Sequence, residues 1–523
     1  MEFHHSYKTL FDKYRDDTVI QKAVQYSKWT LPQLMADMTL VSNGSTLVLE
    51  RDFQEMGALL VNNLSAKLTG LLFPSSRPFY KIKQSKMLKD VARKAGIKEQ
   101  DIAAGLAQLE QSSCQQLFLN SSYEQLVIAL KHLIVTGSVL LYRDSRQSKT
   151  IAFGLQSFGV RRDGRGNLMD CVLREYTDFE ALPPMVQPIL AAKHPSRYKP
   201  ENFGSNRVEL YTRVKRDHDA EGRVIYIVSQ QADDVAVGTP GSYPEHLCPW
   251  QVPCWSLIAG ENYGRGLVED YAGGFAKLSD TSHAATLYGI AASKVVNLVA
   301  PGQGADLDEL QGAETGEYVQ GSADSVKVYE AGDAAKMEQL RIEIEALFQR
   351  LARAFMYKGS VRDAERVTAF ELKQDALEAE NTLGGVYSSL SASMQVPLAH
   401  VLLTEVDDGM MEGIVTEQIK LDIMAGIPAL GRQADVQNLA AAAQDAAAII
   451  PVLAQLSQRI DPERILDVIL AGQSVDASTI FKDEAQMAAE AEAAQQQAQG
   501  QEQIAQATTM ADQAQQLQTI QGT

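Results

Sequence analysis

Three cationic residues recur at intervals of four in one short, glycine-containing stretch of the sequence. They are Lys358, Arg362 and Arg366, and the acids Asp363 and Glu365 separate the last two. Lysine and arginine bind phosphate oxygens, so a cluster of them can hold a polyanion without reading a base sequence. From composition alone, however, a charged surface turn between two helices is the simpler interpretation.

The helices predicted on either side must position this stretch. Before it, apolar residues recur every three or four positions over residues 334–357, which predicts a helix with one apolar stripe, about 35 Å long. The stripe consists of Met337, Leu340, Ile344, Leu347, Leu351 and Ala354. After it, broadly helical spacing predicts one long helix over residues 367–404.

The first 263 residues combine predicted helices with antiparallel hairpins. Residues 1–72 are mainly helical by pattern, and a β-rich region follows from Val139. Turns rich in Asp, Gly and Asn at residues 161–168 and 217–222 are flanked by alternating strands. We therefore expect two hairpins of a half-exposed antiparallel sheet. Residues 405–472 are predicted to be helical again.

The motifs of common enzymes are absent from the sequence. It contains no G-x-x-x-x-G-K-[ST] phosphate loop, and the dipeptide Gly-Lys does not occur. It also contains no H-E-x-x-H and no G-x-S-x-G motif. We therefore expect no enzymatic activity and no cofactor. An enzyme acting on nucleic acid or nucleotides remains the alternative that a nuclease or ATPase assay would test.

One group of potential metal ligands lies between residues 246 and 254. It consists of His246, Cys248 and Cys254, with Pro249 and Pro253 between them. Histidine and cysteine are the usual zinc ligands, but this spacing fits no common zinc pattern. We expect these side chains to pack in the interior and to hold no metal.

Composition limits the class of protein. The chain has 523 residues, of which 45% are hydrophobic, which suits two to four domains with substantial cores. Its formal net charge of −18 argues against a protein that wraps nucleic acid tightly. Only four cysteines occur, so we expect folding in a reducing cytosol rather than a disulfide framework. Neither a signal peptide nor a membrane-spanning helix is predicted.

Several ordered motifs resemble one protein family. They are Val61-Asn-Asn-Leu-Ser-Ala-Lys-Leu-Thr-Gly-Leu-Leu-Phe-Pro, Leu130-Lys-His-Leu-Ile-Val-Thr-Gly-Ser-Val-Leu-Leu-Tyr, Asn262-Tyr-Gly-Arg-Gly-Leu-Val-Glu-Asp-Tyr, Thr315-Gly-Glu-Tyr-Val, Glu365-Arg-Val-Thr-Ala, Asn381-Thr-Leu-Gly-Gly-Val-Tyr-Ser and Met394-Gln-Val-Pro-Leu. Together, over residues 55–405, the sequence resembles the portal, or head-to-tail connector, proteins of short-tailed bacteriophages.

The resemblance implies an α+β fold that is mainly α-helical. Its parts would be a wing of helices and antiparallel hairpins (1–263), a first stem helix (264–290), a small β-containing clip (291–330), a second stem helix (331–357), a tunnel loop (358–366), a long wing helix (367–404), a helical crown (405–472) and an Ala/Gln-rich barrel helix or tail (473–523).

The resemblance also implies a function. Twelve copies would form a ring-shaped DNA channel at one capsid vertex, used for genome packaging, retention and ejection. The cations Lys358, Arg362 and Arg366 would then face the DNA, with the alternative that Arg366 pairs with Glu365 or with the neighbouring subunit. The stem residues Leu340, Ile344, Leu347 and Leu351 would form a subunit interface, although the stripe could instead pack inside the protomer.

The partners implied are double-stranded DNA without sequence specificity, the terminase, a tail adaptor, and the major capsid, scaffolding and internal core proteins. The protein would be a virion component that is assembled in the host cytoplasm, with no membrane partner. An acidic wall would repel phosphate and let the duplex slide. The alternative is an oligomeric helical scaffold or adaptor of the virion that never touches DNA.

Overall fold

The computed structural model describes residues 6–36, 52–75, 77–82, 99–198, 207–293, 295–299, 326–330, 334–357, 369–406 and 423–426. The chain divides into two units, residues 1–430 and 431–523, and all of the described residues belong to the first. The predicted tunnel loop, most of the predicted crown and the Ala/Gln-rich tail therefore lie outside the described residues.

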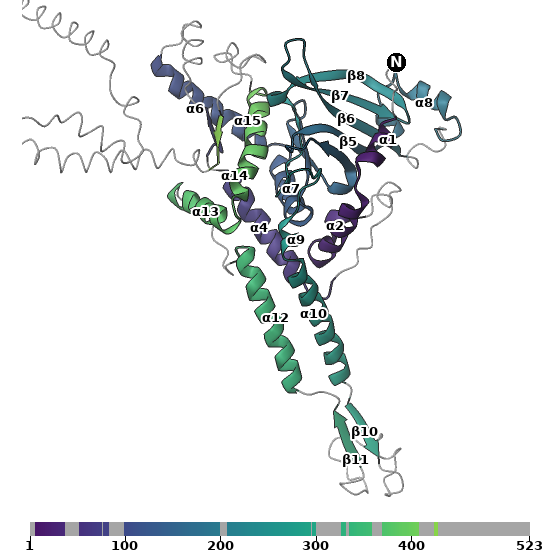
Figure 1. Ribbon diagram of the computed structural model, residues 1–523, viewed down its shortest axis with the longest axis vertical. Helices are drawn as coiled ribbons and strands as arrows, with labels where there is room; N and C mark the ends of the chain where they lie inside the picture. The colour runs from purple at the N-terminus through teal and green to yellow at the C-terminus, as the bar shows by residue number, and fades with distance from the viewer. Residues whose placement is uncertain are drawn as a thin grey trace, which may run out of the picture. The chain divides into compact units, whose positions relative to one another are not determined.

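The fold is a mixture of helices and antiparallel sheets, which confirms the predicted α+β class (Figure 1). The first helices are α1 (Tyr7–Tyr14), α2 (Asp17–Trp29), η1 (Pro32–Met35), α4 (Met56–Leu72), α6 (Glu99–Gln115), η2 (Gln116–Phe118) and α7 (Ser122–Thr136). Local chemistry sets several of their ends. The Asp16 carboxylate caps α2 by accepting hydrogen bonds from the backbone N–H groups of Thr18 and Val19, and Gly137 ends α7 at a φ of 80°.

A five-stranded antiparallel sheet has the order β4-β5-β6-β7-β8. Its strands are β4 (Phe158–Arg162), β5 (Leu168–Thr177), β6 (Val208–His218), β7 (Val224–Ala232) and β8 (Val235–Pro244). Both predicted hairpins are confirmed as β4–β5 and β6–β7. In each turn an aspartate side chain, from Asp163 or Asp219, accepts two backbone hydrogen bonds, and Gly166 and Gly222 adopt positive φ.

The two faces of this sheet have different neighbours. Helix α1 lies on one face, where Phe11 packs with Val172 and Tyr211. The Arg174 guanidinium lies 4.7 Å from the centre of the Phe11 ring, a cation–π contact that adds to the burial. The other face carries a second apolar cluster shared with the small sheet β3-β2-β9. The strands of that small sheet are β2 (Leu140–Asp144), β3 (Lys149–Phe153) and β9 (Trp250–Gln251).

Strand β8 is an edge of the five-stranded sheet, since it pairs only with β7. It contains Pro240 and Pro244, and its register is irregular between the pairs that involve Val228 and Gln230. Proline has no N–H group, so each proline removes a donor from the open edge. Shorter elements between the strands are η3 (Leu155–Ser157), η4 (Phe179–Ala181), α8 (Gln187–Lys193) and η6 (Glu245–Leu247).

The prediction of one long helix over residues 367–404 is wrong. The chain forms α13 (Ala369–Thr382), α14 (Val386–Leu390), a π-helical turn (Ser391–Gln395) and α15 (Val396–Leu403). Two glycines cause the first break, because Gly384 and Gly385 adopt φ angles of 62° and 87°. The π-helical turn comes just before Pro397, which cannot donate a helical hydrogen bond.

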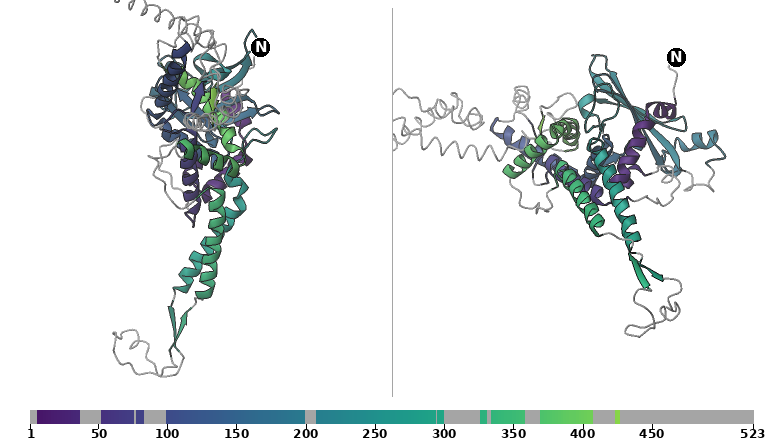
Figure 2. Two further views of the ribbon diagram at one scale, coloured as in Figure 1. Left: turned by 90° about the vertical axis from the view of Figure 1, so that its left-hand side faces the viewer. Right: turned by 60° about the horizontal axis from the view of Figure 1, so that its bottom comes forward.

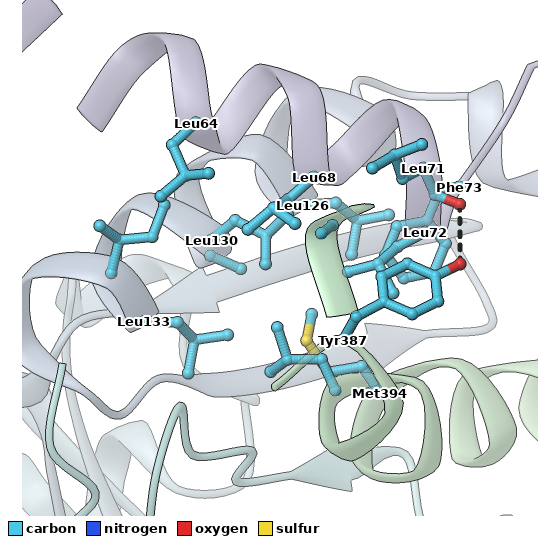
Figure 3. Close-up of a cluster of buried hydrophobic side chains, with 14 of the residues drawn as sticks. Leu64, Leu68, Leu71, Leu72, Phe73, Leu126, Leu130, Leu133, Tyr387 and Met394 are labelled. Carbon is cyan, nitrogen blue, oxygen red and sulfur yellow. Dashed lines mark hydrogen bonds between the residues drawn. The ribbon is translucent and has the colours of Figure 1, made fainter. Parts of the chain in front are cut away.

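The resulting bend places Tyr387 of α14 and Met394 of the π-helical turn in the apolar cluster formed with α4 and α7 (Figure 3), while α15 packs on α6. Leu64 and Leu68 of α4, Leu130 of α7, and Tyr387 and Met394 form part of one fully buried apolar cluster. The hydroxyl of Tyr387 donates a hydrogen bond of 3.2 Å to the carbonyl oxygen of Leu71, one of the last carbonyls of α4. The Gln395 side-chain amide donates similarly to the carbonyl oxygen of Leu72. These bonds satisfy carbonyls that the end of a helix leaves unpaired.

The prediction that residues 405–472 are helical fails at residues 423–425. They form strand β12 (Ile423–Ala425), which pairs antiparallel with β1 (Tyr80–Ile82). The ladder pairs the backbone groups that the two short strands turn toward each other. Because β1 lies more than 300 residues before β12 in the sequence, no local pattern could reveal the strand. Among the described residues, no helix combines the length and apolar character needed to span a membrane.

Candidate functional site

Two long helices run side by side and are joined by a hairpin (Figures 1 and 2). They are α10 (Ala272–Ala292) and α12 (Ala334–Ala354), and the hairpin strands are β10 (Val295–Val299) and β11 (Val326–Glu330). The predicted second helix is confirmed as α12. The predicted first helix begins later than residue 264, because the one-turn helix α9 (Leu267–Asp270) precedes α10 and the two are separated at Tyr271.

We call the described residues outside α10, β10, β11 and α12 the body of the protein. The end of the helix pair nearest the body is well packed. Leu351 of α12 is fully buried in the apolar cluster that also contains Phe275 and Leu278 of α10. The ring of Phe355 packs edge-on against Phe275, with ring centres 5.6 Å apart. A Cβ atom at Gly274 would lie 3.2 Å from Leu351 Cδ2, so glycine permits the close approach of the two helices. This end of the pair is held within a single protomer.

Further along, the same helices expose large apolar side chains. Leu287 and Ile290 of α10 are each 55% exposed, and Ile342 of α12 is 59% exposed. Sequence reasoning missed these residues. The available signal was that Ile342 lies off the apolar stripe of α12, so that helix carries an apolar residue on a second side. A neighbouring apolar surface would cover this residue.

Charges between and along the helices are mostly exposed. Lys277 Nζ of α10 lies 2.6 Å from Glu343 Oε1 of α12, which ties the two helices together at the surface. An exposed ion pair of this kind contributes less than about 1 kcal/mol. Along α12, the hydrogen bonds from Arg341 lower the pKa of Glu338. Apolar packing rather than charge therefore holds the pair.

Helix α12 ends in a Schellman motif. The N–H of Tyr357 donates to the carbonyl oxygen of Ala352 at 2.8 Å, and the N–H of Met356 donates to that of Arg353 at 3.2 Å. Met356 takes the left-handed position usually given to glycine, with a φ of 53°. Its side chain is buried in the apolar cluster, which holds this less favourable backbone conformation in place.

Glycines join the helix pair to the body. A Cβ atom added at Gly137 would lie 2.3 Å from the carbonyl oxygen of Gly264. A Cβ atom added at Gly264 would lie 2.5 Å from the carbonyl oxygen of Gly137. A Cβ at Gly266 would lie 2.6 Å from the carbonyl oxygen of Ile134. The end of α7 and the segment that leads into α9 therefore meet backbone to backbone. The Ser138 hydroxyl adds a hydrogen bond by accepting from the Gly264 N–H at 2.8 Å.

The predicted site residues fall into two groups. Leu347 and Leu351 are buried within the protomer, at 5% and 0% exposure, whereas Leu340 and Ile344 are only partly buried. The role of these four residues at a subunit interface stays a prediction. Lys358, Arg362 and Arg366 lie outside the described residues, so their role also stays a prediction.

The potential metal ligands have separate partners. The ring of His246 lies edge-on to that of His400, and the Cys248 thiol donates to the carbonyl oxygen of Trp250. Burial raises the pKa of Cys248 to about 12, which keeps the thiol protonated and disfavours metal binding. Cys254 accepts a hydrogen bond from Arg162 at 3.3 Å. Within the part of the chain that the structure describes, no group of three or more metal-binding side chains comes together.

The fold combines a body of helices and antiparallel sheets with a long helix pair, and comparisons with known proteins identify its family. Residues 5–480 match the family described as bacteriophage head to tail connecting protein. The portal protein of Pseudomonas phage phiKMV is 44% identical over 505 residues, which cover 96% of each chain. The portal protein of Enterobacteria phage SP6 is 30% identical over 426 residues, or 81% of this chain and 79% of that one.

A chain from the neck of an empty GTA particle matches 75% of this chain and 86% of its own length, at 11% identity and a TM-score of 0.36. The sequence matches establish the family without it. The chain belongs to the head-to-tail connecting proteins of bacteriophages.

Proposed function

We propose that this chain is the portal subunit of a short-tailed bacteriophage and that its copies form a ring-shaped DNA channel at one capsid vertex. The observation that carries the proposal is the match of residues 5–480 to the head-to-tail connector family. The channel serves genome packaging, retention and ejection. In this proposal the stem consists of α10 and α12, the clip comprises residues 291–330, and the tunnel loop comprises residues 358–366.

The exposed apolar residues of the helix pair support assembly into a ring. A ring of identical copies needs two different complementary surfaces on each subunit. Leu287 and Ile290 lie on one helix of the pair and Ile342 lies on the other, and a neighbouring subunit on either side would cover them. The interface predicted at Leu340 and Ile344 extends the same region of α12. We propose a ring of twelve.

Charge supports a channel through which DNA slides. Twelve chains of net charge −18 make a strongly acidic ring that repels phosphate, so the duplex meets little friction. Cations at Lys358, Arg362 and Arg366 would then be the places where the channel holds DNA. Binding of this kind involves the phosphates and carries no sequence specificity.

The test is a double variant in the predicted tunnel loop. Lys358→Ala with Arg362→Ala should leave ring assembly intact and reduce the yield of DNA-filled particles or their retention of DNA. The matched control is Lys13→Ala with Arg165→Ala, which removes the same charge from exposed positions outside the helix pair. Negative-stain electron microscopy of purified rings and counts of filled particles are the measurements. Normal filled particles from the loop variant would contradict a role of the loop in holding DNA.

The same proposal fixes the partners and the location. The terminase and then a tail adaptor would dock at the clip, and the major capsid, scaffolding and internal core proteins would contact the rest of the ring. The protein is then a virion component at the capsid vertex that assembles in the host cytoplasm and acts without catalysis. Rings that lack an open channel would instead point to an adaptor that does not touch DNA.

A further inference from the structure

A cleft of about 980 Å³ lies between the five-stranded sheet and the end of α15. Its walls include the turn that joins β2 to β3, residues 239–241 of β8, and residues 404–406, which follow α15. Both apolar groups, such as Val237 and Leu403, and polar groups, such as Gln230 and Thr239, line it. A ligand in this cleft would therefore meet both apolar surface and hydrogen-bonding groups.

Arg143 lies on the wall of this cleft with its side chain almost fully buried. Nη1 donates hydrogen bonds to Ser122 Oγ at 3.0 Å and to Thr150 Oγ1 at 3.2 Å, and Nη2 donates to the carbonyl oxygen of Gln116 at 3.4 Å. These partners belong to α7, β3 and η2. They hold the guanidinium in place from three elements of the body, independently of its carboxylate ligand.

That ligand is Glu405. Arg143 Nε donates to Oε1 at 2.9 Å and Nη2 donates to Oε2 at 2.6 Å, so the carboxylate is bound by both oxygens. Glu405 is the second residue beyond the end of α15, and 262 positions separate it from Arg143 in the sequence. Within the described part of the chain, both hydrogen bonds that the structure shows for this carboxylate go to Arg143.

Arg143 and Glu405 therefore differ in how many other hydrogen-bond partners hold their side chains. If the turn at residues 404–406 moved into the cleft, Arg143 would keep three of its partners, whereas Glu405 would leave with its own segment. A buried guanidinium cannot remain without an anion, because the desolvation of an unpaired charge is costly. Release of Glu405 therefore requires another carboxylate to take its place.

We propose that Arg143 is a carboxylate-binding site that Glu405 occupies within the chain, and that an acidic side chain of a partner polypeptide entering the cleft replaces Glu405. The planar guanidinium with two N–H groups facing one carboxylate is the geometry that selects this ligand class. The exchange would free the segment that follows α15. The proposal does not depend on DNA binding, so it stands or falls separately from the portal function.

The first experiment is chemical rescue of Glu405→Ala in the full chain. This variant leaves the guanidinium preformed and vacates the carboxylate position. Acetate should raise its thermal unfolding midpoint by about 2 °C or more as the site fills, because a ligand that binds only the folded state stabilises it. If the variant does not fold alone, the recovery of folded protein in acetate relative to chloride is measured instead.

Three controls distinguish binding at Arg143 from a general salt effect. Chloride at equal ionic strength should not rescue Glu405→Ala. Acetate should have no effect on Glu405→Gln, whose side chain still fills the position, or on Arg143→Met combined with Glu405→Ala, which lacks the receptor. Equal shifts with chloride, or in the variant without Arg143, would overturn the proposal, as would the absence of any rescue.

A second arm tests the polypeptide ligand. The tripeptide acetyl-Gly-Glu-Gly-amide should rescue Glu405→Ala at a lower concentration than acetate does, because it also contacts the cleft. Its partner acetyl-Gly-Gln-Gly-amide, which lacks the negative charge, should have no effect. Rescue by acetate without rescue by the glutamate peptide would overturn the part of the proposal that concerns a protein partner.

Discussion

The body of the protein and its helix pair treat apolar side chains in opposite ways. In the body, Leu64, Leu68 and Leu130 are fully buried by residues of the same chain. Along the helix pair, Leu287 and Ile342 remain more than half exposed. Burial of one such side chain contributes about 1.5–3 kcal/mol, so the exposed residues represent stabilisation that only a neighbour can supply. The body therefore buries its apolar residues within the chain, whereas the helix pair leaves some of them available for the proposed subunit interface.

Where the two regions meet, three glycine positions have no room for even a Cβ atom. The glycines at 137, 264 and 266 bring backbone against backbone, and Leu351 and Phe355 fill the adjoining core. The helix pair is therefore fixed firmly at one end and open to neighbours along its length. Substitutions in the packed end and along the exposed length of the helix pair should therefore separate folding from assembly.

Leu351→Asp should have the largest effect. It places a carboxylate at a position with no exposure, and we expect a loss of about 4 kcal/mol or more in the free energy of unfolding. Urea denaturation of the purified chain, followed by circular dichroism, measures the loss. A variant that unfolds like the wild type would show that α12 does not depend on this contact within the protomer.

Gly137→Ala should come second, with a loss of about 2–3 kcal/mol. The residue has a φ of 80°, which costs a non-glycine residue about 1–2 kcal/mol, and its Cβ would lie 2.3 Å from the Gly264 carbonyl oxygen. Gly222→Ala is the matched control, because it has a φ of 78° and open space around its Cβ position. Equal losses from both variants would attribute the effect to φ alone and remove the close contact from the argument.

Glu175→Gln should remove a pH dependence from the free energy of unfolding. Burial raises the pKa of Glu175 to about 7 from an ordinary value of 4.5, so the folded chain favours the neutral carboxyl. The stability that this group contributes is complete below pH 4.5 and is lost as the pH rises through 7. The variant should be about 2 kcal/mol more stable than the wild type at pH 8, after allowance for partial exposure, and similar at pH 4. Urea titrations of both proteins at pH 4 and pH 8 measure this difference. A difference in the free energy of unfolding that is the same at both pH values would contradict this account.

Ile342→Asp should have the smallest effect on the protomer, within about 0.5 kcal/mol, because the side chain is 59% exposed. It should nevertheless prevent ring formation, since a charge would be placed in the proposed interface. Size-exclusion chromatography with light scattering measures assembly, and urea titration of the same sample measures folding. Intact rings would show that the subunit interface does not include this side of α12.

Much of the fold could be predicted because its signals are local. The turn residues Asp163 and Asp219 with their glycines marked both hairpins, and the three-to-four spacing of apolar residues marked α12. The long helix over residues 367–404 failed because two adjacent glycines were given less weight than the apolar periodicity around them. Here the left-handed backbone at Gly384 and Gly385 determined the structure.

The rest depended on partners distant in the sequence. Strand β12 exists because β1 pairs with it, and the Arg143–Glu405 pair joins residues 262 positions apart. The candidate site shows the same limit. The apolar stripe of α12 was visible in the sequence, but which of its members face α10 and which remain open was decided by the packing of the helix pair.

The prolines of β8 affect how unassembled chains can contact one another. A portal ring needs many identical chains at one place, and an open strand edge repeated on each copy is a template for cross-β stacking into fibrils. Pro240 and Pro244 interrupt the row of N–H groups on that edge, so a second β8 cannot pair along its full length. Proline on this edge therefore disfavours the pairing of one chain's β8 with that of the next while the chains are still unassembled.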